Sequence, residues 1–306
     1  LNYETLGYEP TKQPKLPIVK TAKEAGSLKN RLPILLKDQT KAGELIRKHY
    51  ASLFAYVSQR VPEITDVFYS IDDAMKTGYA GKYGPFGNWD FLGIQKGIDL
   101  VESEGYKVAD WVKEMLASGN ESFYKLENGK QLFYNQNTKT YEPIPGLDAF
   151  IILDNIRKEK TIWSNSESAL IDLGDGILNF EFRSKMNSLG GGVLEGLNKS
   201  IEIAEKDYRG LVIGNQSDNF SVGANLAMVM MMAVEQDWYE LNMAINLFQQ
   251  TSMKLRYSSI PVIAAPFGMT LGGGCEFSMH SDKIVAAAET YIGLVEAGVG
   301  LIPGGG

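Results

Sequence analysis

The sequence has very few side chains based on sulfur or imidazole. Its 306 residues include one cysteine, Cys275, and two histidines, His49 and His280. A single cysteine excludes an intramolecular disulfide framework, and so few cysteines and histidines leave no cluster with metal-ligand spacing. We therefore expect a protein of a reducing compartment that binds no metal ion.

Long apolar runs and an excess of positive charge are also missing. No apolar run approaches the ~18 residues that a membrane-spanning helix needs, and residues 1–15 lack the charged-then-apolar form of a signal peptide. The net charge of -7 and the pI of about 5.1 argue against a nucleic-acid partner. With 44% hydrophobic and 22% charged residues, the chain is expected to be globular, with room for two domains. We expect no membrane insertion and a cytoplasmic location.

A glycine-rich segment at residues 268–306 is the most informative part of the sequence. The predicted strand 258–266 runs toward three successive glycines, 272–274, and a short helix is predicted over 275–281. Three glycines leave backbone N–H groups uncovered by side chains, and a helix that begins beside them presents unpaired donors and a positive dipole end. Such a place suits a developing negative charge.

Two carboxylates accompany these glycines. Glu276 lies in the first turn of the predicted helix, and Glu296 follows a predicted strand at 283–287 and a turn around Glu289. One helix and one strand can therefore bring two carboxyl groups face to face. The alternative interpretation is a plain tight turn with two solvated glutamates.

A second exposed amide is predicted upstream, within residues 210–226. A short strand at 210–214 and a polar turn lead to Val222-Gly223-Ala224, where another helix begins. Two N–H donors from separate helix starts suit one thioester oxygen, which favours chemistry over a plain turn. The methionine-rich run that follows, 228–232, is expected to pack inward, either as flexible core filler or as the lining of an acyl pocket.

Three ordered blocks, FSVGANL, LGGGCE and GLVEAGVGLIPGGG, resemble the crotonase superfamily, and specifically its enoyl-CoA hydratases, over about residues 168–306. The resemblance implies that the backbone amides of Ala224 and Gly273 form the oxyanion hole. It also implies that Glu276 and Glu296 are the catalytic pair, with Glu276 handling water and Glu296 handling the α-proton. Asn225 departs from the Asp common at its position in the family, which puts the cap of the following helix in doubt.

The same resemblance implies contacts with a coenzyme A thioester substrate. Val222 lies in the first block, and Lys185 lies in SKMNSLG, which resembles the loop beside the CoA in crotonases. Gly304 is implied to supply an amide near the reacting water, and the hydratase reaction needs no metal or redox cofactor. Cys275 has no histidine base beside it in sequence, and His280 is interpreted as a helix-end residue, so neither is expected to be catalytic.

The N-terminal part is predicted to be mainly helical. Apolar residues at helical spacing predict helices over about 39–60, 65–78, 91–105 and 108–119, with Thr65 as a cap of the second and the loop YAGKYGPFGNW after it. A hairpin is predicted over 123–134, because Asn128-Gly129 suits a type I′ turn. Turn-rich residues 141–146 predict a linker, and a hairpin over 169–182 opens the second domain.

Residues 60–93 carry a second resemblance, to the C-terminal helical domain of 3-hydroxyacyl-CoA dehydrogenases. The match covers about 27–118 and rests on the segments IDDAM, GPFGNWD and ADWVKEML. That family's nucleotide fingerprint, GxGxxG after a strand, is absent from the sequence, and so is its upstream catalytic histidine, for which His49 is no substitute. NAD is therefore expected only for a dehydrogenase part outside these residues. The alternative is a helical packing domain without chemistry.

The predicted fold class is α/β. A mainly α-helical domain with a small hairpin and a linker, residues 1–146, is expected to precede a crotonase-type ββα spiral, residues 147–306, that is incomplete at its C-terminus. Because the sequence begins with Leu1 and stops inside a glycine loop, we expect a piece of a bifunctional fatty-acid β-oxidation protein. In that protein the dehydrogenase part would precede the hydratase part.

The function that the resemblance implies is hydration of trans-2-enoyl-CoA to 3-hydroxyacyl-CoA, a lyase reaction, within a multifunctional enzyme that also has NAD-dependent oxidoreductase activity. The 306-residue chain alone is expected to be weakly active. One alternative is an enoyl-CoA isomerase, which can manage with one glutamate. The other is a non-catalytic acyl-CoA-binding or assembly fragment. The expected partners are an acyl-CoA substrate, a second copy in a homo-oligomer and a β-oxidation thiolase.

Overall fold

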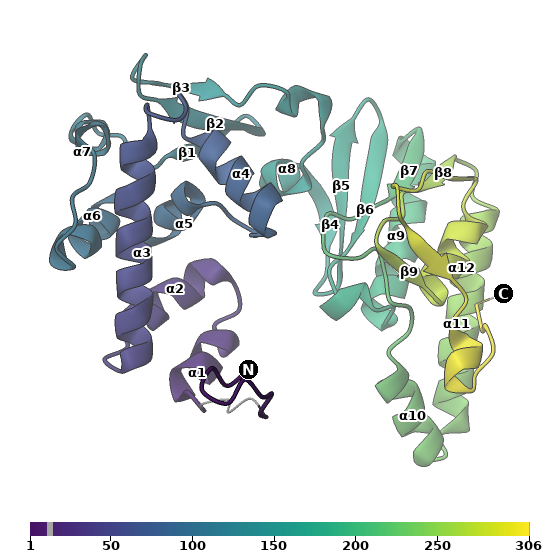
Figure 1. Ribbon diagram of the computed structural model, residues 1–306. Helices are drawn as coiled ribbons and strands as arrows, with labels where there is room; N and C mark the ends of the chain where they lie inside the picture. The colour runs from purple at the N-terminus through teal and green to yellow at the C-terminus, as the bar shows by residue number, and fades with distance from the viewer. Residues whose placement is uncertain (11–14, 306) are drawn as a thin grey trace. The chain divides into compact units, whose positions relative to one another are not determined.

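The computed structural model describes residues 1–10 and 15–305 (Figure 1). The chain divides into two compact units, Leu1–Leu147 and Asp148–Gly306. The first is mainly helical, and the second is a mixed unit built on a six-stranded sheet. None of the described helices combines the length and the apolar content that crossing a bilayer requires.

Helices dominate the first unit, and a small antiparallel sheet in the order β1-β2-β3 follows them. The elements are α1 (Pro17–Glu24), α2 (Leu28–Leu36), α3 (Lys41–Arg60), α4 (Tyr69–Tyr79), α5 (Pro85–Leu92), α6 (Ile94–Ser103), α7 (Asp110–Ala117), β1 (Tyr124–Glu127), β2 (Lys130–Asn135) and β3 (Thr140–Pro143). Asn128 and Gly129 both have positive φ, 51° and 72°. The predicted type I′ hairpin is therefore confirmed.

Aromatic side chains form the core of this unit. Trp89 of α5 stacks on Phe54 of α3 with 4.7 Å between ring centroids, and its indole N–H donates to the carbonyl of Ile94 at 3.1 Å. Gly97 of α6 lies against the indole so closely that an added Cβ would overlap it. The glycine is therefore required by the packing of the two helices.

Three local predictions for this unit are wrong. Thr65 does not cap α4, which begins at Tyr69; its hydroxyl instead bonds the backbone of Val67 in a turn. The predicted loop after α4 contains helix α5, because Pro85 takes the first helical position, where its missing N–H costs nothing. Residues 141–146 are not only a linker, since the strand β3 extends to Pro143 and pairs with β2.

The second unit is organised around a sheet in the order β10-β8-β7-β6-β5-β4. Its elements are η1 (Leu147–Ala149, at the boundary), α8 (Leu153–Lys160), β4 (Thr161–Ser164), β5 (Ser168–Gly174), β6 (Ile177–Phe182), η2 (Lys185–Asn187), α9 (Gly191–Asp207), β7 (Gly210–Ile213), α10 (Leu226–Val234), α11 (Trp238–Arg256), β8 (Val262–Ala264), β9 (Met269–Leu271), α12 (Gly273–His280), β10 (Lys283–Ile284), β11 (Tyr291–Gly293) and η3 (Glu296–Val299). The hairpin β5–β6 turns at Asp175-Gly176, as predicted.

Successive strands of this unit alternate between the large sheet and a small one. The strands β7, β8 and β10 lie parallel in the large sheet. Each is followed by a short extended segment, namely residues 220–223, β9 and β11, that runs beside the others in the small layer. The first two of these segments lead into helices, α10 and α12, and the third leads into the 3-10 turn η3. This repetition is the predicted ββα spiral, and the predicted α/β fold class is confirmed.

The methionine-rich helix α10 does not pack inward. It has no buried residue, and Met230, for example, is 64% exposed. Helix α11, against which α10 packs, buries only its C-terminal part around Leu255, whereas Trp238 at its start is 60% exposed. The sequence prediction failed because α10 is apolar on every face, so its composition does not indicate which face would be covered.

Candidate active site

Three parallel backbone segments end at the same edge of the small layer. Strand β9 pairs with β11 on one side and with residues 220–223 on the other, through the Ser221–Thr270 bridge. The N–H of Leu271 donates to the carbonyl of Ser221 at 2.9 Å, and the N–H of Gly272 donates to that of Gly293 at 3.0 Å. Because the three segments end together, the residues that follow each of them are brought to one place.

The two predicted oxyanion amides, those of Ala224 and Gly273, lie next to each other at this edge. An ideal Cβ on Gly223 would lie 3.3 Å from the nitrogen of Gly273 and 2.9 Å from the carbonyl oxygen of Leu271. Only glycine, with its φ of +83° here, allows these two backbone segments to approach so closely. Across the residues that the structure describes, neither predicted amide donates a hydrogen bond to the protein. Both N–H groups are therefore available to an acceptor.

Helix α10 begins directly after Ala224 with an intact cap. Asn225 occupies the N-cap position, and its side-chain oxygen accepts from the N–H of Met228 at 3.4 Å. Asn is as good an N-cap residue as Asp. The departure from the family's Asp therefore leaves the helix start, and with it the direction of the Ala224 amide, in place.

Glu276 lies in the first turn of α12 and is only 3% exposed. Its Oε1 accepts from the N–H of Gly305 at 2.7 Å. Burial raises the pKa of this carboxyl above its usual range, and the nearby charge of Glu296 raises it further, whereas the Gly305 hydrogen bond and His280 oppose the increase. The site thus holds a carboxyl group that binds a proton more readily than an exposed glutamate does.

Glu296 follows β11 by three positions and opens the turn η3. Its Oε1 approaches the backbone of Gly272, where an ideal Cβ would lie only 2.9 Å away. Its Oε2 is buried and has no hydrogen-bond partner among the described residues. An unpaired buried carboxylate oxygen is costly, so this atom is available for a hydrogen bond with a ligand.

The glycine loop after η3 meets Glu276 through a residue that the sequence analysis missed. Gly304, the predicted amide donor, is exposed and uses its carbonyl to accept from Gln249 Nε2 at 2.9 Å. The amide that reaches Glu276 belongs to its neighbour, Gly305. Position 305 must be glycine, because a Cβ there would overlap the ring of Phe248 on α11. The sequence shows the glycine but not the ring, which comes from a distant helix.

The predicted substrate-binding residues Val222 and Lys185 lie on two segments that contact each other. Val222 is half-buried and directly precedes Gly223, whose carbonyl accepts from the N–H of Leu189 at 2.9 Å. Lys185 is exposed on the turn η2 and forms no ion pair within the described residues. Asn187 secures this turn, since its side-chain N–H groups donate to Ser217 Oγ and to a nearby carbonyl at 2.7 and 2.9 Å.

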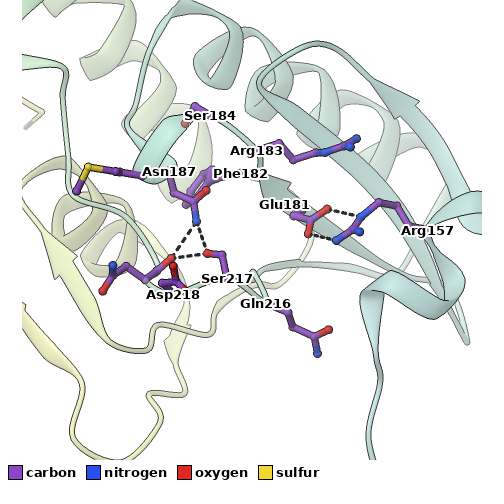
Figure 2. A pocket seen from close by; sticks show the side chains of 11 residues that line it. Arg157, Glu181, Phe182, Arg183, Ser184, Asn187, Gln216, Ser217 and Asp218 are labelled. Atoms are coloured by element: carbon purple, nitrogen blue, oxygen red, sulfur yellow. Dashed lines mark hydrogen bonds and ion pairs between the residues drawn. The ribbon is translucent and has the colours of Figure 1, made fainter. Parts of the chain in front are cut away.

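A polar cavity of about 500 Å³ lies beside this turn, and Figure 2 shows the side chains that line it. Its walls come from the end of β6, the turn η2 and the loop after β7, with Arg157 and Glu181 joined by two hydrogen bonds of 3.0 and 2.6 Å. Two lining residues, Ser184 and Met186, flank Lys185. The lining includes neither predicted catalytic glutamate nor either predicted oxyanion residue, so the cavity adjoins only the predicted CoA loop.

Cys275 and His280 take supporting positions in α12. Cys275 is buried, and burial raises the pKa of its thiol, followed by the charges of Glu276 and Glu296, so the thiolate is disfavoured. His280 ends the helix, and its Nδ1 lies 2.8 Å from the carbonyl oxygen of Glu276. No group of three acidic, histidine or cysteine side chains is placed to hold a metal ion within the described ranges 1–10 and 15–305.

Sequence comparison gives a family for this region. The sequence model of the family "Enoyl-CoA hydratase/isomerase" matches residues 174–306. Residues 174–306 therefore match the enoyl-CoA hydratase/isomerase family, and the resemblance drawn from the three glycine-containing blocks is confirmed. The match includes all of the predicted site residues.

Relatives also cover the residues before this domain. A Bacillus subtilis protein named "Probable 3-hydroxyacyl-CoA dehydrogenase" is 42% identical over 99% of this chain, which spans 38% of that relative's length. A Rickettsia felis protein named "Putative fatty acid oxidation complex trifunctional enzyme" is 32% identical over 90% of this chain, which spans 35% of its length. Among solved structures, an enoyl-CoA hydratase from Bacillus anthracis is 26% identical, with a TM-score of 0.42 over 46% of this chain and 55% of its own.

Proposed function

We propose that the domain hydrates trans-2-enoyl-CoA thioesters to 3-hydroxyacyl-CoA. The observation that carries the proposal is the convergence of three parallel segments, which places two free amides and two carboxyl groups at one edge of the small layer. The family match supports the same class of substrate.

The amides of Ala224 and Gly273 would bind the thioester oxygen. Addition of water to the β-carbon moves negative charge onto this oxygen, so donors fixed in advance stabilise the transition state more than the ground state. Gly273 also starts α12, whose positive dipole end favours negative charge. Removal of one such donor in other enzymes costs roughly 10²–10³-fold in kcat.

The two carboxyl groups would divide the transfer of protons. The Glu276 carboxylate takes a proton from water while the water oxygen bonds to the β-carbon. Glu296, as the acid, gives a proton to the α-carbon, so the pair ends with the same number of protons. A raised pKa makes Glu276 a stronger base than an ordinary glutamate. Sharing of one proton between neighbouring carboxyl groups is the expected arrangement.

The cavity beside η2 supports a place for the polar end of the substrate. Lys185 is exposed next to it, and Arg183 lines it without an ion pair in the described chain. Two cations on a loop whose end, Leu189, pairs with Gly223 and Ala224 suit the phosphate groups of CoA. The thioester would then lie between this loop and the two amides.

Product analysis tests the proposal directly. With crotonyl-CoA, the protein should form 3-hydroxybutyryl-CoA, and both Glu276→Gln and Glu296→Gln should lower kcat/KM by about 10²–10⁴. Glu289→Gln is the control, because Glu289 is an exposed carboxylate in the turn between β10 and β11; its rate should match the wild type. Near-native turnover in either of the first two variants contradicts the two-carboxylate mechanism.

Two other outcomes define the alternatives. Conversion of a 3-enoyl-CoA to the 2-enoyl isomer, with no hydration, would identify an isomerase, for which a single glutamate suffices. Binding of CoA without turnover of either substrate would support an acyl-CoA-binding or assembly role.

A dehydrogenase activity of a longer protein that contains this chain is a second part of the proposal. The relatives' names support a 3-hydroxyacyl-CoA dehydrogenase part that uses NAD. The described strands of the first unit are antiparallel, whereas dinucleotide folds bind at the ends of parallel strands, so the proposal assigns NAD to a dehydrogenase part outside residues 1–147. A homo-oligomer and a thiolase partner belong to the same proposal, and light scattering with and without the thiolase tests both.

A further inference from the structure

The peptide group between Gly304 and Gly305 connects helix α11 to the candidate catalytic carboxyl. Its N–H, that of Gly305, donates to Glu276 Oε1 at 2.7 Å. Its carbonyl, that of Gly304, accepts from Gln249 Nε2 at 2.9 Å. Both bonds belong to one planar amide. A continuous chain of hydrogen bonds therefore runs from the Gln249 side chain to Glu276.

Helix α11 holds this peptide group from two sides. Next to Gln249, the ring of Phe248 lies against Gly305 and stacks on Phe277 of α12, with 4.8 Å between ring centroids. The same ring approaches Gly273, where an ideal Cβ would lie 2.9 Å from Phe248 Cζ. Gly304 and Gly305 have no side chains of their own to fix them, so the position of their peptide group depends on these contacts with α11.

We propose that Gln249 is a positioning residue of this site, which orients and polarises the Gly304–Gly305 peptide group so that its N–H holds and stabilises the Glu276 carboxylate. Gln249 acts only through the peptide group and touches no reacting atom. As a statement about turnover this inference rests on the proposed function. As a statement about the titration of Glu276 it stands independently.

Polarisation of the amide favours the ionised form of Glu276. A hydrogen bond donated to an amide oxygen strengthens the bond that the same amide donates, by about 10–30% in condensed phases. The strengthening is greater for an ionised acceptor, because charge-assisted bonds are roughly twice as strong as neutral ones. The other groups that face this carboxyl are Glu296, His280 and Cys275; none of them bonds to Gln249 within the described residues.

Gln249→Met removes the donor while it keeps the length of the side chain. In the ligand-free protein labelled with ¹³C on glutamate side chains, the Glu276 resonance is assigned by its loss in Glu276→Gln. We expect the titration midpoint of Glu276 to rise by about 0.2–0.6 pH units in Gln249→Met. Gln250→Met is the matched control, since Gln250 is exposed on α11, as Gln249 is, and its side chain forms no hydrogen bond in the described chain. The Glu276 midpoint should not move in that variant.

Turnover separates this inference from the proposed function. With crotonyl-CoA, Gln249→Met should lower kcat about two- to tenfold and leave KM nearly constant, whereas Gln250→Met should change neither. An unshifted Glu276 midpoint in Gln249→Met, in a protein whose unfolding temperature shows an intact fold, overturns the positioning role. If the Glu276 midpoint shifts in Gln249→Met but the wild-type protein has no hydratase activity, the positioning role is supported and the proposed function is overturned.

Discussion

Replacing Gly272 by alanine tests how the structure places Glu296. Gly272 joins β9 to α12 with φ of +53° and ψ of -124°, a conformation that is essentially confined to glycine. An ideal Cβ would lie 2.9 Å from Glu296 Oε1, which is closer than real Cβ atoms approach. Because the N–H of Gly272 is bonded to the carbonyl of Gly293, the backbone has little freedom to move. The added methyl group should therefore displace the carboxylate.

The magnitudes follow from these two effects. Backbone strain at such a residue is on the order of 1–3 kcal/mol, which should lower the unfolding temperature by several degrees. A carboxylate displaced by ~1 Å should lower kcat by about 10²-fold. The affinity for CoA should change less than about threefold, because Gly272 does not lie on the η2 loop or beside the polar cavity.

Steady-state hydration of crotonyl-CoA and calorimetric binding of CoA, both on Gly272→Ala, give the two quantities. Gly298→Ala is the matched control: Gly298 lies in η3, two positions after Glu296, and an added Cβ would meet nothing within 4 Å. It should behave like the wild type. If Gly272→Ala retained kcat within about twofold of the wild type, the contact between this glycine and Glu296 would not control the position of the proposed catalytic acid.

Two further expectations follow from packing and from burial. Gly97→Ala in α6 should destabilise the first unit by about 1–3 kcal/mol, because the added methyl group overlaps the Trp89 indole. Gly78→Ala in α4, where an added Cβ meets nothing within 4 Å, should stabilise the unit by up to about 1 kcal/mol. Denaturant unfolding that ranks the two variants in the opposite order contradicts this account of the packing. The value of kcat/KM should fall with decreasing pH as Glu276 takes up a proton. Because burial raises the pKa of Glu276 from 4.5, the midpoint of this fall should lie above pH 4.5. A midpoint at or below pH 4.5 contradicts the burial argument.

The sequence identified the segments of the site but not the contacts that join them. The GGG run, the Val-Gly-Ala step and both glutamates were all predicted to meet, because strand ends and helix starts can be recognised from local patterns. Their roles in catalysis stay predictions. The expected role of Gly304, an amide near the reacting water, stays a prediction; the amide that bonds Glu276 is that of Gly305. Local sequence does not show which glycine of the run bonds Glu276, because the ring of Phe248 that packs against Gly305 comes from a distant helix.

The errors elsewhere have a common physical cause. Burial of α10 and the cap at Thr65 were inferred from residue type alone, but both depend on tertiary contacts. Helix α5 was hidden by glycines and aromatic residues that are typical of loops, and the proline at its first position was the only local sign of a start. Residue types thus indicated how apolar or turn-forming each segment is, but not which tertiary contacts it makes.

The pairing of Ser221 with Thr270 has a consequence for when the site forms during folding. This pairing closes a loop that contains all of α10 and α11, and the entropy of loop closure opposes it until the pairing is complete. The amides of Ala224 and Gly273 lie on opposite sides of that closure. An intermediate with every helix formed but this loop open would hold both glutamates on one segment and lack half of the proposed oxyanion hole. Competence for the proposed reaction should therefore arise only when the segments around Ser221 and Thr270 meet.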